Sequence, residues 1–149
     1  MGFAINRLRA DNSYRNIDKT LWEDSIVNYL WIAIGAVAGA CARYFLSDLI
    51  TRNFALAFPY STLLINVTGS LVVGFFLVYS TERVLLDPRW RLVLAIGFCG
   101  SYTTFSSYAF ESFALMERGQ WLMMSLNIVA SNVFCLAAVL AGAAVARGL

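Results

Sequence analysis

Four long apolar stretches, separated by short polar segments, make up most of the chain after residue 29. A helix needs about 20 mostly apolar residues to cross the hydrocarbon core of a bilayer. The stretches meet this requirement and predict four transmembrane helices, at about 30–50, 61–80, 91–116 and 121–145. We therefore expect an all-α membrane protein whose four-helix transmembrane domain covers 30–149.

Proline and capping residues mark the predicted helix boundaries. Pro59 and Pro88 stand where the second and third helices begin, and Asp87 is a suitable N-cap. Residues 117–120 alone separate the third helix from the fourth, which predicts a tight helical hairpin.

The first 29 residues form a polar N-terminal extension that holds 8 of the 20 charged residues. Thr20 and Glu23 have the spacing of a capping box, which predicts a short helix from about Thr20 into the first span. Trp22, Ile26 and Tyr29 would then share an amphipathic face suited to the membrane surface. The pattern fits a partly disordered tail with a short helix equally well.

The composition agrees with a membrane protein and argues against an enzyme. Charged residues make up only 13% of the chain and apolar residues 60%, whereas a soluble domain has about 25% charged residues. The absence of histidine excludes a Ser-His-Asp triad, a histidine-ligated zinc site and a histidine proton relay. Cys41, Cys99 and Cys135 lie far apart in apolar stretches and are expected to be packing residues. The net charge of +2, without a basic cluster, gives no sign of a nucleic-acid partner.

Charges that flank the predicted helices indicate the orientation. Near the spans, six Lys or Arg residues lie on the side of the termini and two on the side of the short hairpins. The six are Arg15, Lys19, Arg83, Arg89, Arg91 and Arg147, and the two are Arg52 and Arg118. Because cytoplasmic loops carry the excess of positive charge, this bias predicts a multi-pass protein of the inner (plasma) membrane with cytoplasmic termini.

Arg43 lies within the first predicted span, where a central arginine costs about 2.5–3.5 kcal/mol. It follows Gly35 and Gly39 at intervals of four, so all three share one helix face. A glycine face of this kind packs against another helix, which would turn Arg43 toward protein. Arg43 is then either a fixed positive charge that attracts an anion or an arginine that snorkels to the headgroups.

Small and polar residues recur at helical spacing on one face of the second and fourth helices. They are Asn66, Gly69, Ser70, Val73 and Gly74 in the second helix and Asn127, Ser131, Cys135, Ala138 and Gly142 in the fourth. Such stripes allow close helix packing. For Asn66 and Ser131, lining a pore is the alternative.

The predicted third helix carries features that a smooth lipid-facing helix would lack. Gly97, Gly100 and five Ser or Thr residues fall between 97 and 107. We expect a break near 100–103, whose freed carbonyls would need a partner such as a cation. Beyond it, Phe105, Tyr108 and Glu111 share a face, and the positive ring edges of the two aromatic residues can solvate a small anion. Ordinary aromatic packing is the alternative.

These residues resemble the Fluc, or CrcB, fluoride channels, small four-span proteins with a broken third helix reading roughly G-x-x-T-T-F-S-[ST]-F-x-x-E. The matching positions are Gly100, Thr103, Thr104, Phe105, Ser106, Ser107 and Glu111. Residues 35–44 resemble the first-span pattern G-x-x-x-G-x-x-x-R-Y, and 59–69 resemble the second-span pattern P-x-x-T-L-x-x-N-x-x-G. The likeness extends over about 30–142.

The resemblance implies a fluoride-selective channel that passively exports fluoride, built as an antiparallel dimer with two pores. It also implies a role for each matching position. Phe105 and Tyr108 would meet the ion with their ring edges, Asn66 and Ser131 would donate hydrogen bonds, Thr104 and Glu111 would support the path, and Arg43 would lie near the vestibule. The backbone carbonyls of Gly100 and Thr103 from both subunits would hold a structural sodium ion at the dimer centre.

The chain departs from the family pattern at three places. Tyr108 replaces the usual second phenylalanine, and Cys135 replaces a common hydroxyl residue. The N-terminal extension is longer than usual, and its charges favour one orientation. In an antiparallel homodimer the same chain must insert in both orientations. A heterodimer with a paralogous subunit is therefore an alternative to the homodimer.

Two other functions compete with the channel. A small-multidrug-resistance-like exporter also has four spans, but it needs a glutamate in the first span, where this chain has Arg43 and Asp48. A structural membrane subunit without transport would leave the broken helix and Arg43 unexplained.

Overall fold

The computed structural model describes residues 2–53, 58–83 and 86–149, with side chains from Ser25 onward except Arg83. All regular structure in these ranges is helical. The elements are α1 (Gly2–Asn53), α2 (Tyr60–Val78), η1 (Tyr79–Arg83), α3 (Pro88–Trp90), η2 (Arg91–Cys99), α4 (Gly100–Tyr102), α5 (Phe105–Glu117) and α6 (Trp121–Gly148). The η elements are π-helical.

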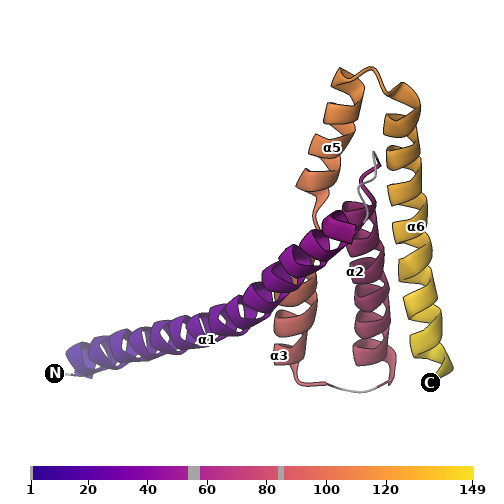
Figure 1. The fold of residues 1–149 in the computed structure, drawn as a ribbon. Helices are drawn as coiled ribbons and strands as arrows, with labels where there is room; N and C mark the ends of the chain where they lie inside the picture. Colours follow the sequence, from indigo (N-terminus) through magenta and orange to yellow (C-terminus); the bar gives the residue numbers. More distant parts are fainter. Residues whose placement is uncertain (1, 54–57, 84–85) are drawn as a thin grey trace.

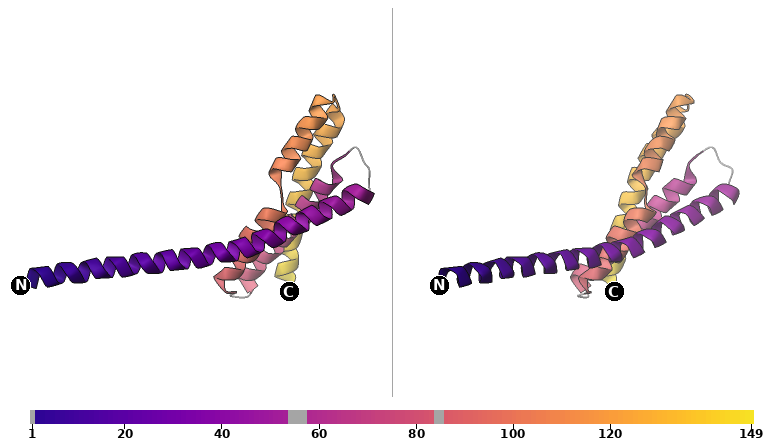
Figure 2. Two further views of the ribbon diagram at one scale, coloured as in Figure 1. Left: turned by 60° about the vertical axis from the view of Figure 1, so that its left-hand side comes forward. Right: turned by 90° about the vertical axis from the view of Figure 1, so that its left-hand side faces the viewer.

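The helices form two closely packed pairs. One pair is α2 with α6, which lie side by side, and the other is α1 with η2 and α4. Helix α1 crosses the rest of the molecule obliquely, and its N-terminal half extends beyond it (Figures 1 and 2). Helix α5 contacts mainly α6, with which it forms a hairpin.

Three of the four predicted spans are single helices. Ser25–Asn53, Tyr60–Glu82 and Trp121–Gly148 are long and apolar enough to cross a membrane. The predicted span 91–116 consists instead of η2, α4 and α5, because the helix is interrupted between Tyr102 and Phe105. The expectation of a broken third helix is therefore confirmed.

The N-terminal extension continues the first span as one helix. Helix α1 begins at Gly2, so the expected start near Thr20 was wrong, and 2–29 is helical throughout. The capping-box side chains of Thr20 and Glu23 and the ring of Trp22 lie outside the described side chains. Of the amphipathic face predicted around them, Ile26 and Tyr29 are exposed.

The predicted helix boundaries are confirmed. Pro59 precedes α2, and the side chain of Asp87 accepts a hydrogen bond from the backbone N–H of Arg89 at 2.9 Å. The hairpin between α5 and α6 is closed by Gly119, whose φ of 71° is in the left-handed region that glycine tolerates.

Glycines bring the helix backbones into direct contact. A Cβ on Gly39 would collide with the backbone of Phe98 in η2, and a Cβ on Gly74 would collide with the backbone of Val139 in α6. The helix-packing role predicted for the glycine face of the first span is therefore confirmed. Among the cysteines, Cys99 is buried in this packing, whereas Cys41 is exposed on α1, against the packing prediction.

Candidate functional site

The break in the third helix lies at two threonines. Thr103 has φ −78° and ψ 157°, and Thr104 has φ −149° and ψ 113°, so both are extended. Gly100 remains helical. The interruption therefore begins at the C-terminal end of the predicted segment 100–103 and continues one residue beyond it.

Asn66 of α2 holds the extended backbone at the break. Its Oδ1 accepts a hydrogen bond from the backbone N–H of Thr104 at 2.8 Å, and its Nδ2 donates to the carbonyl of the same residue at 3.0 Å. One side chain therefore satisfies both backbone groups of Thr104, which is 8% exposed. A buried backbone group without a partner costs about 1–3 kcal/mol, so this pairing stabilises the break.

Thr104 also begins the next helix. Its hydroxyl oxygen accepts a hydrogen bond from the backbone N–H of Ser107 at 3.1 Å, which makes it the N-cap of α5. The same oxygen lies 3.0 Å from the hydroxyl of Ser107. The Thr104 side chain is therefore part of the structure that orients α5.

The carbonyls of Gly100 and Thr103 lose their usual donors at the break. In a continuous helix they would accept from the N–H groups of Thr104 and Ser107. Those groups donate instead to Asn66 and to the Thr104 hydroxyl. Gly100 is exposed, with no atom near its Cα that a Cβ would strike. Both carbonyl oxygens therefore lack their helical donors, and freed backbone carbonyls in broken membrane helices are a type of group that coordinates cations.

A pocket of about 350 Å³ lies beside the break. It collects five of the seven predicted pore residues, Asn66, Thr104, Phe105, Tyr108 and Ser131, together with Thr103. The remaining lining residues are Gly69, Ser70, Val73, Asn132, Cys135 and Val139. Residues from α2, the broken helix and α6 thus surround one space. The polar groups that line the pocket are hydroxyl groups, side-chain amides and backbone groups, all of which are neutral.

Two aromatic rings stand at this pocket. The ring centroids of Phe105 and Tyr108 are 5.3 Å apart and the planes are inclined by 58°. Phe105 is 78% exposed in the single chain, so its ring is not buried in an aromatic core. The edge of each ring carries a partial positive charge, so a ring at this position can contribute an edge to the pocket wall.

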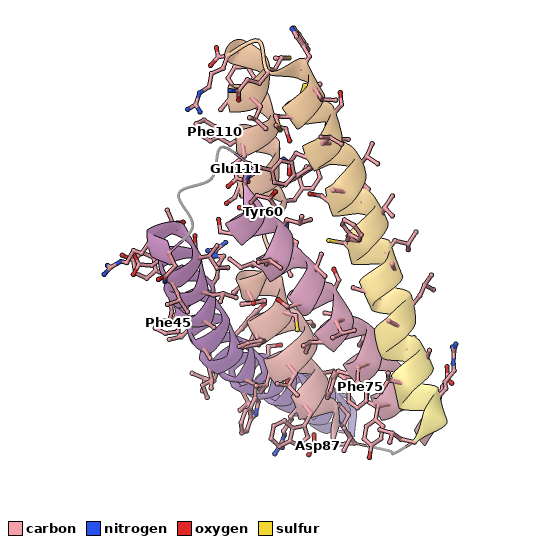
Figure 3. The ribbon with its side chains drawn as sticks, turned by 45° about the vertical axis from the view of Figure 1, so that its right-hand side comes forward. Phe45, Tyr60, Phe75, Asp87, Phe110 and Glu111 are labelled. Carbon is pink, nitrogen blue, oxygen red and sulfur yellow. The ribbon has the colours of Figure 1, made fainter. Side chains whose placement is uncertain are left out.

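Glu111 lies outside the pocket lining, against the N-terminal part of α2 (Figure 3). The hydroxyl of Thr62 donates to Glu111 Oε1 at 2.6 Å. Oε2 is buried and has no hydrogen-bond partner among the described residues. Thr62, which is 6% exposed, was not among the predicted site residues. It lies one helical turn before Asn66, and the second-span pattern contained it.

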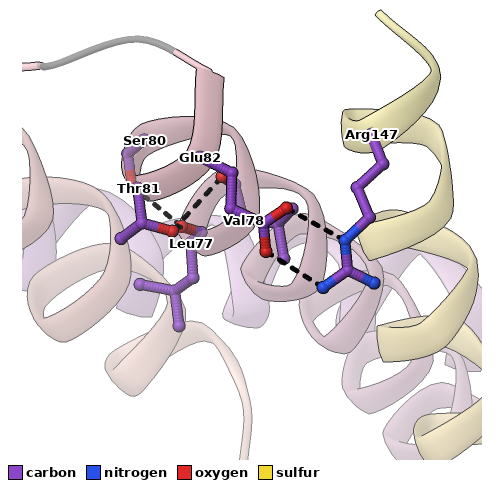
Figure 4. A network of polar contacts seen from close by, with 6 residues as sticks. All are labelled: Leu77, Val78, Ser80, Thr81, Glu82 and Arg147. Carbon is purple, nitrogen blue, oxygen red and sulfur yellow. Dashed lines mark hydrogen bonds and ion pairs between the residues drawn. The ribbon is translucent and has the colours of Figure 1, made fainter.

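Arg43 is half-buried on α1 and does not line the pocket. Within the part of the chain that the structure describes, it makes no ion pair or side-chain hydrogen bond. Other arginines differ: Arg52 pairs with Asp48 at 2.8 Å, and Arg147 contacts both oxygens of Glu82 at 3.0 Å (Figure 4). The positive charge of Arg43 is therefore not neutralised by a carboxylate among the described residues.

A buried polar chain continues from the pocket toward the hairpin. Ser131 donates to Asn127 Oδ1 at 3.5 Å, Asn127 donates to Ser112 at 2.9 Å, and Ser112 donates to the carbonyl of Tyr108 at 2.8 Å. Asn127 is only 1% exposed. The chain fixes the part of α6 that carries Ser131 relative to α5.

Asn132 is a pocket residue that sequence reasoning missed. The predicted polar stripe on this helix contains Asn127, Ser131 and Cys135, and Asn132 lies on the neighbouring face. The pocket is also lined by Cys135 and Val139, which follow Asn132 at i+3 and i+7. This helical spacing in the sequence could have predicted that Asn132 shares a face with Cys135.

Known proteins that are similar to this chain belong to one family. Residues 30–143 match the family model described as CrcB-like protein, Camphor Resistance (CrcB). The chain is 54% identical to the fluoride-specific ion channel FluC of Koribacter versatilis over 84% of this chain and 99% of the relative. It is 42% identical to the FluC of Roseiflexus sp. over 83% and 99%, and 40% identical to that of Legionella pneumophila strain Lens over 82% and 91%.

Proposed function

The chain belongs to the CrcB family, and we propose that it is a fluoride-selective channel that passively exports fluoride and lowers its cytoplasmic concentration. Family membership agrees with the expectation that the protein is not an enzyme. Family membership gives no support to the two alternative functions, a small-multidrug-resistance-like exporter and a structural membrane subunit without transport.

The observation that carries the proposal is the gathering of Asn66, Thr104, Phe105, Tyr108 and Ser131 around one pocket. Fluoride is a small, strongly hydrated anion, so a pore must replace its water with other donors. Hydroxyl and amide groups and positive ring edges can do so without a full charge that would hold the ion too tightly. Asn66 keeps one of its two amide hydrogens for this role, because the other is used by Thr104.

Arg43 supplies the attraction at longer range. Its charge has no carboxylate partner among the described residues, and it lies on α1, away from the pocket. We place it at the vestibule, where it raises the local anion concentration.

We further propose an antiparallel dimer with two pores, each built from both subunits. The support is the open face of the single chain: on α5, Phe105 is 78% exposed, and Phe110, which is labelled in Figure 3, is 70% exposed. A second copy would cover the Phe105 ring and complete the pore wall. The charge bias of the N-terminal extension favours one orientation, so a paralogous subunit is the alternative partner.

A structural sodium ion at the dimer centre is part of this proposal. The carbonyls of Gly100 and Thr103 would hold it, and both are released from helical hydrogen bonding at the break. One chain offers two such oxygens, so the second subunit would supply the others. The ion would fix the two broken helices relative to each other.

The direct test is fluoride efflux from liposomes that contain the purified protein, followed with a fluoride electrode. We expect fluoride efflux well above that of protein-free vesicles and no comparable chloride efflux. Fluoride efflux equal to that of empty vesicles would refute conduction, and equal chloride efflux would refute selectivity.

A further inference from the structure

Tyr108 and Asn132 form a hydrogen-bonded pair across the pocket. Asn132 Nδ2, on α6, lies 3.4 Å from Tyr108 Oη, on α5. The same nitrogen donates to the carbonyl of Ile128 at 2.7 Å, one turn earlier in α6. The backbone contact fixes the amide plane, and the second amide hydrogen is directed to the tyrosine.

The direction of this hydrogen bond decides what the hydroxyl can still do. An amide nitrogen donates and does not accept, so Tyr108 Oη is the acceptor. A phenol has one proton, and the contact with Asn132 does not use it. The O–H of Tyr108 is therefore left to donate to another group.

The Tyr108 hydroxyl, whose proton is not used by Asn132, belongs to a side chain that lines the pocket. Tyr108 and Asn132 both line the pocket, next to Ser131 and Phe105. In a hydrated anion pathway, the Tyr108 hydroxyl can donate its hydrogen bond to water or to the anion. A hydrogen bond to an ionised acceptor is stronger than one between neutral groups.

We propose that Tyr108 binds the permeating fluoride through its O–H and that Asn132 is the residue that orients this hydroxyl as a donor. The inference rests on the proposed function and deepens it: the aromatic site would be one ring edge and one phenol rather than two ring edges. Asn132 acts through Tyr108 and is a positioning residue.

The test measures the fluoride concentration that gives half-maximal flux, separately from the maximal flux, in liposomes of defined fluoride content. Tyr108→Phe keeps the ring and removes the donor, so we expect the half-saturating concentration to rise about tenfold while conduction persists. Asn132→Ala is also expected to raise the half-saturating fluoride concentration. The double variant is expected to match Tyr108→Phe, because the two residues act as one unit.

Val133→Ala is the matched control, since Val133 is exposed on α6 beside Asn132 and does not line the pocket. If Asn132→Ala does not reconstitute, Asn132→Leu removes the same donor while keeping the number and branching of the side-chain heavy atoms. An unchanged half-saturating concentration in Tyr108→Phe, or independent effects that multiply in the double variant, would overturn the inference while fluoride conduction by the wild type stands. Absence of conduction by the wild type would instead overturn the proposed function, and this inference with it.

Discussion

The side-chain amide of Asn66 pairs with the backbone of Thr104 in both directions, 2.8 Å to its N–H and 3.0 Å to its carbonyl. The contact joins α2 to the point where the third helix breaks, 38 residues later in the chain. It supplies two of the hydrogen bonds that a helix interrupted in a membrane must find elsewhere. The shape of the pocket therefore depends on one asparagine.

The first prediction concerns this pairing. Asn66→Ala leaves the N–H and the carbonyl of Thr104 without partners, at about 1–3 kcal/mol for each group. We expect a lower melting temperature in detergent and loss of fluoride flux. Asn53→Ala is the control, because among the described residues Asn53 bonds only to the carbonyl of Leu49 in its own helix, at an exposed position. Equal melting temperatures for the two variants would contradict the role given to Asn66.

The second prediction separates the hydroxyl of Thr104 from its backbone. Thr104→Val keeps the shape but removes the N-cap of α5, which costs about 0.5–2 kcal/mol. Thr104→Ser retains the capping oxygen and should behave as the wild type in thermal unfolding. Flux should fall with Thr104→Val and persist with Thr104→Ser. If Thr104→Ser loses flux while Thr104→Val retains it, the methyl group rather than the capping hydroxyl is what the site needs.

The helical architecture could be predicted from the sequence because hydrophobicity and helix caps are local signals. Pro59, Asp87 and the turn at Gly119 fall at the expected boundaries. The break was predicted near 100–103 from Gly100 and the hydroxyl residues around it, and it lies at Thr103 and Thr104, so it begins within the predicted segment and ends one residue beyond it. That last residue is held by Asn66, which lies in another helix, so no local pattern contains this contact.

The residues of the candidate site were predicted better than their contacts. Asn66 and Ser131 emerged from stripes of small residues, but periodicity does not show which atoms an amide will bind. Asn132 was missed because it lies beside the stripe, and Thr62 was missed because its partner, Glu111, is 49 residues away. The start of α1 at Gly2 was also missed, since the polar residues before Thr20 have no apolar period that marks a helix.

The third prediction tests the aromatic wall. Phe105→Ala removes a ring that is 78% exposed in the single chain, so the fold of one subunit should not change. We expect fluoride efflux to slow by at least tenfold, with an unchanged elution volume in size-exclusion chromatography. Phe113→Ala on the same helix removes a ring that is 47% exposed in the single chain and does not line the pocket, and its flux should stay near that of the wild type. Equal flux in wild type and Phe105→Ala would remove Phe105 from the pore.

The fourth prediction tests the charge of Arg43. Arg43→Gln should lower fluoride flux most at low ionic strength, because salt screens the attraction between a fixed charge and an approaching anion. Arg43→Lys should restore much of the flux. Arg52→Gln serves as the control, since the charge of Arg52 is already paired with Asp48 at 2.8 Å. A loss of flux that is the same at all salt concentrations would point to a packing role for Arg43.

The fifth prediction concerns the N-terminal part of α1 and the orientation of the chain. Deleting residues 2–19 removes Arg15 and Lys19 from the side that holds six Lys or Arg residues near the spans, leaving four against two. We expect a C-terminal reporter to show a strong preference for the cytoplasmic side in the full chain and a more even distribution after the deletion. The transmembrane helices are unchanged by the deletion, so any shift is due to the extension. A single orientation for both proteins would exclude an antiparallel homodimer and favour a partner subunit of fixed opposite orientation.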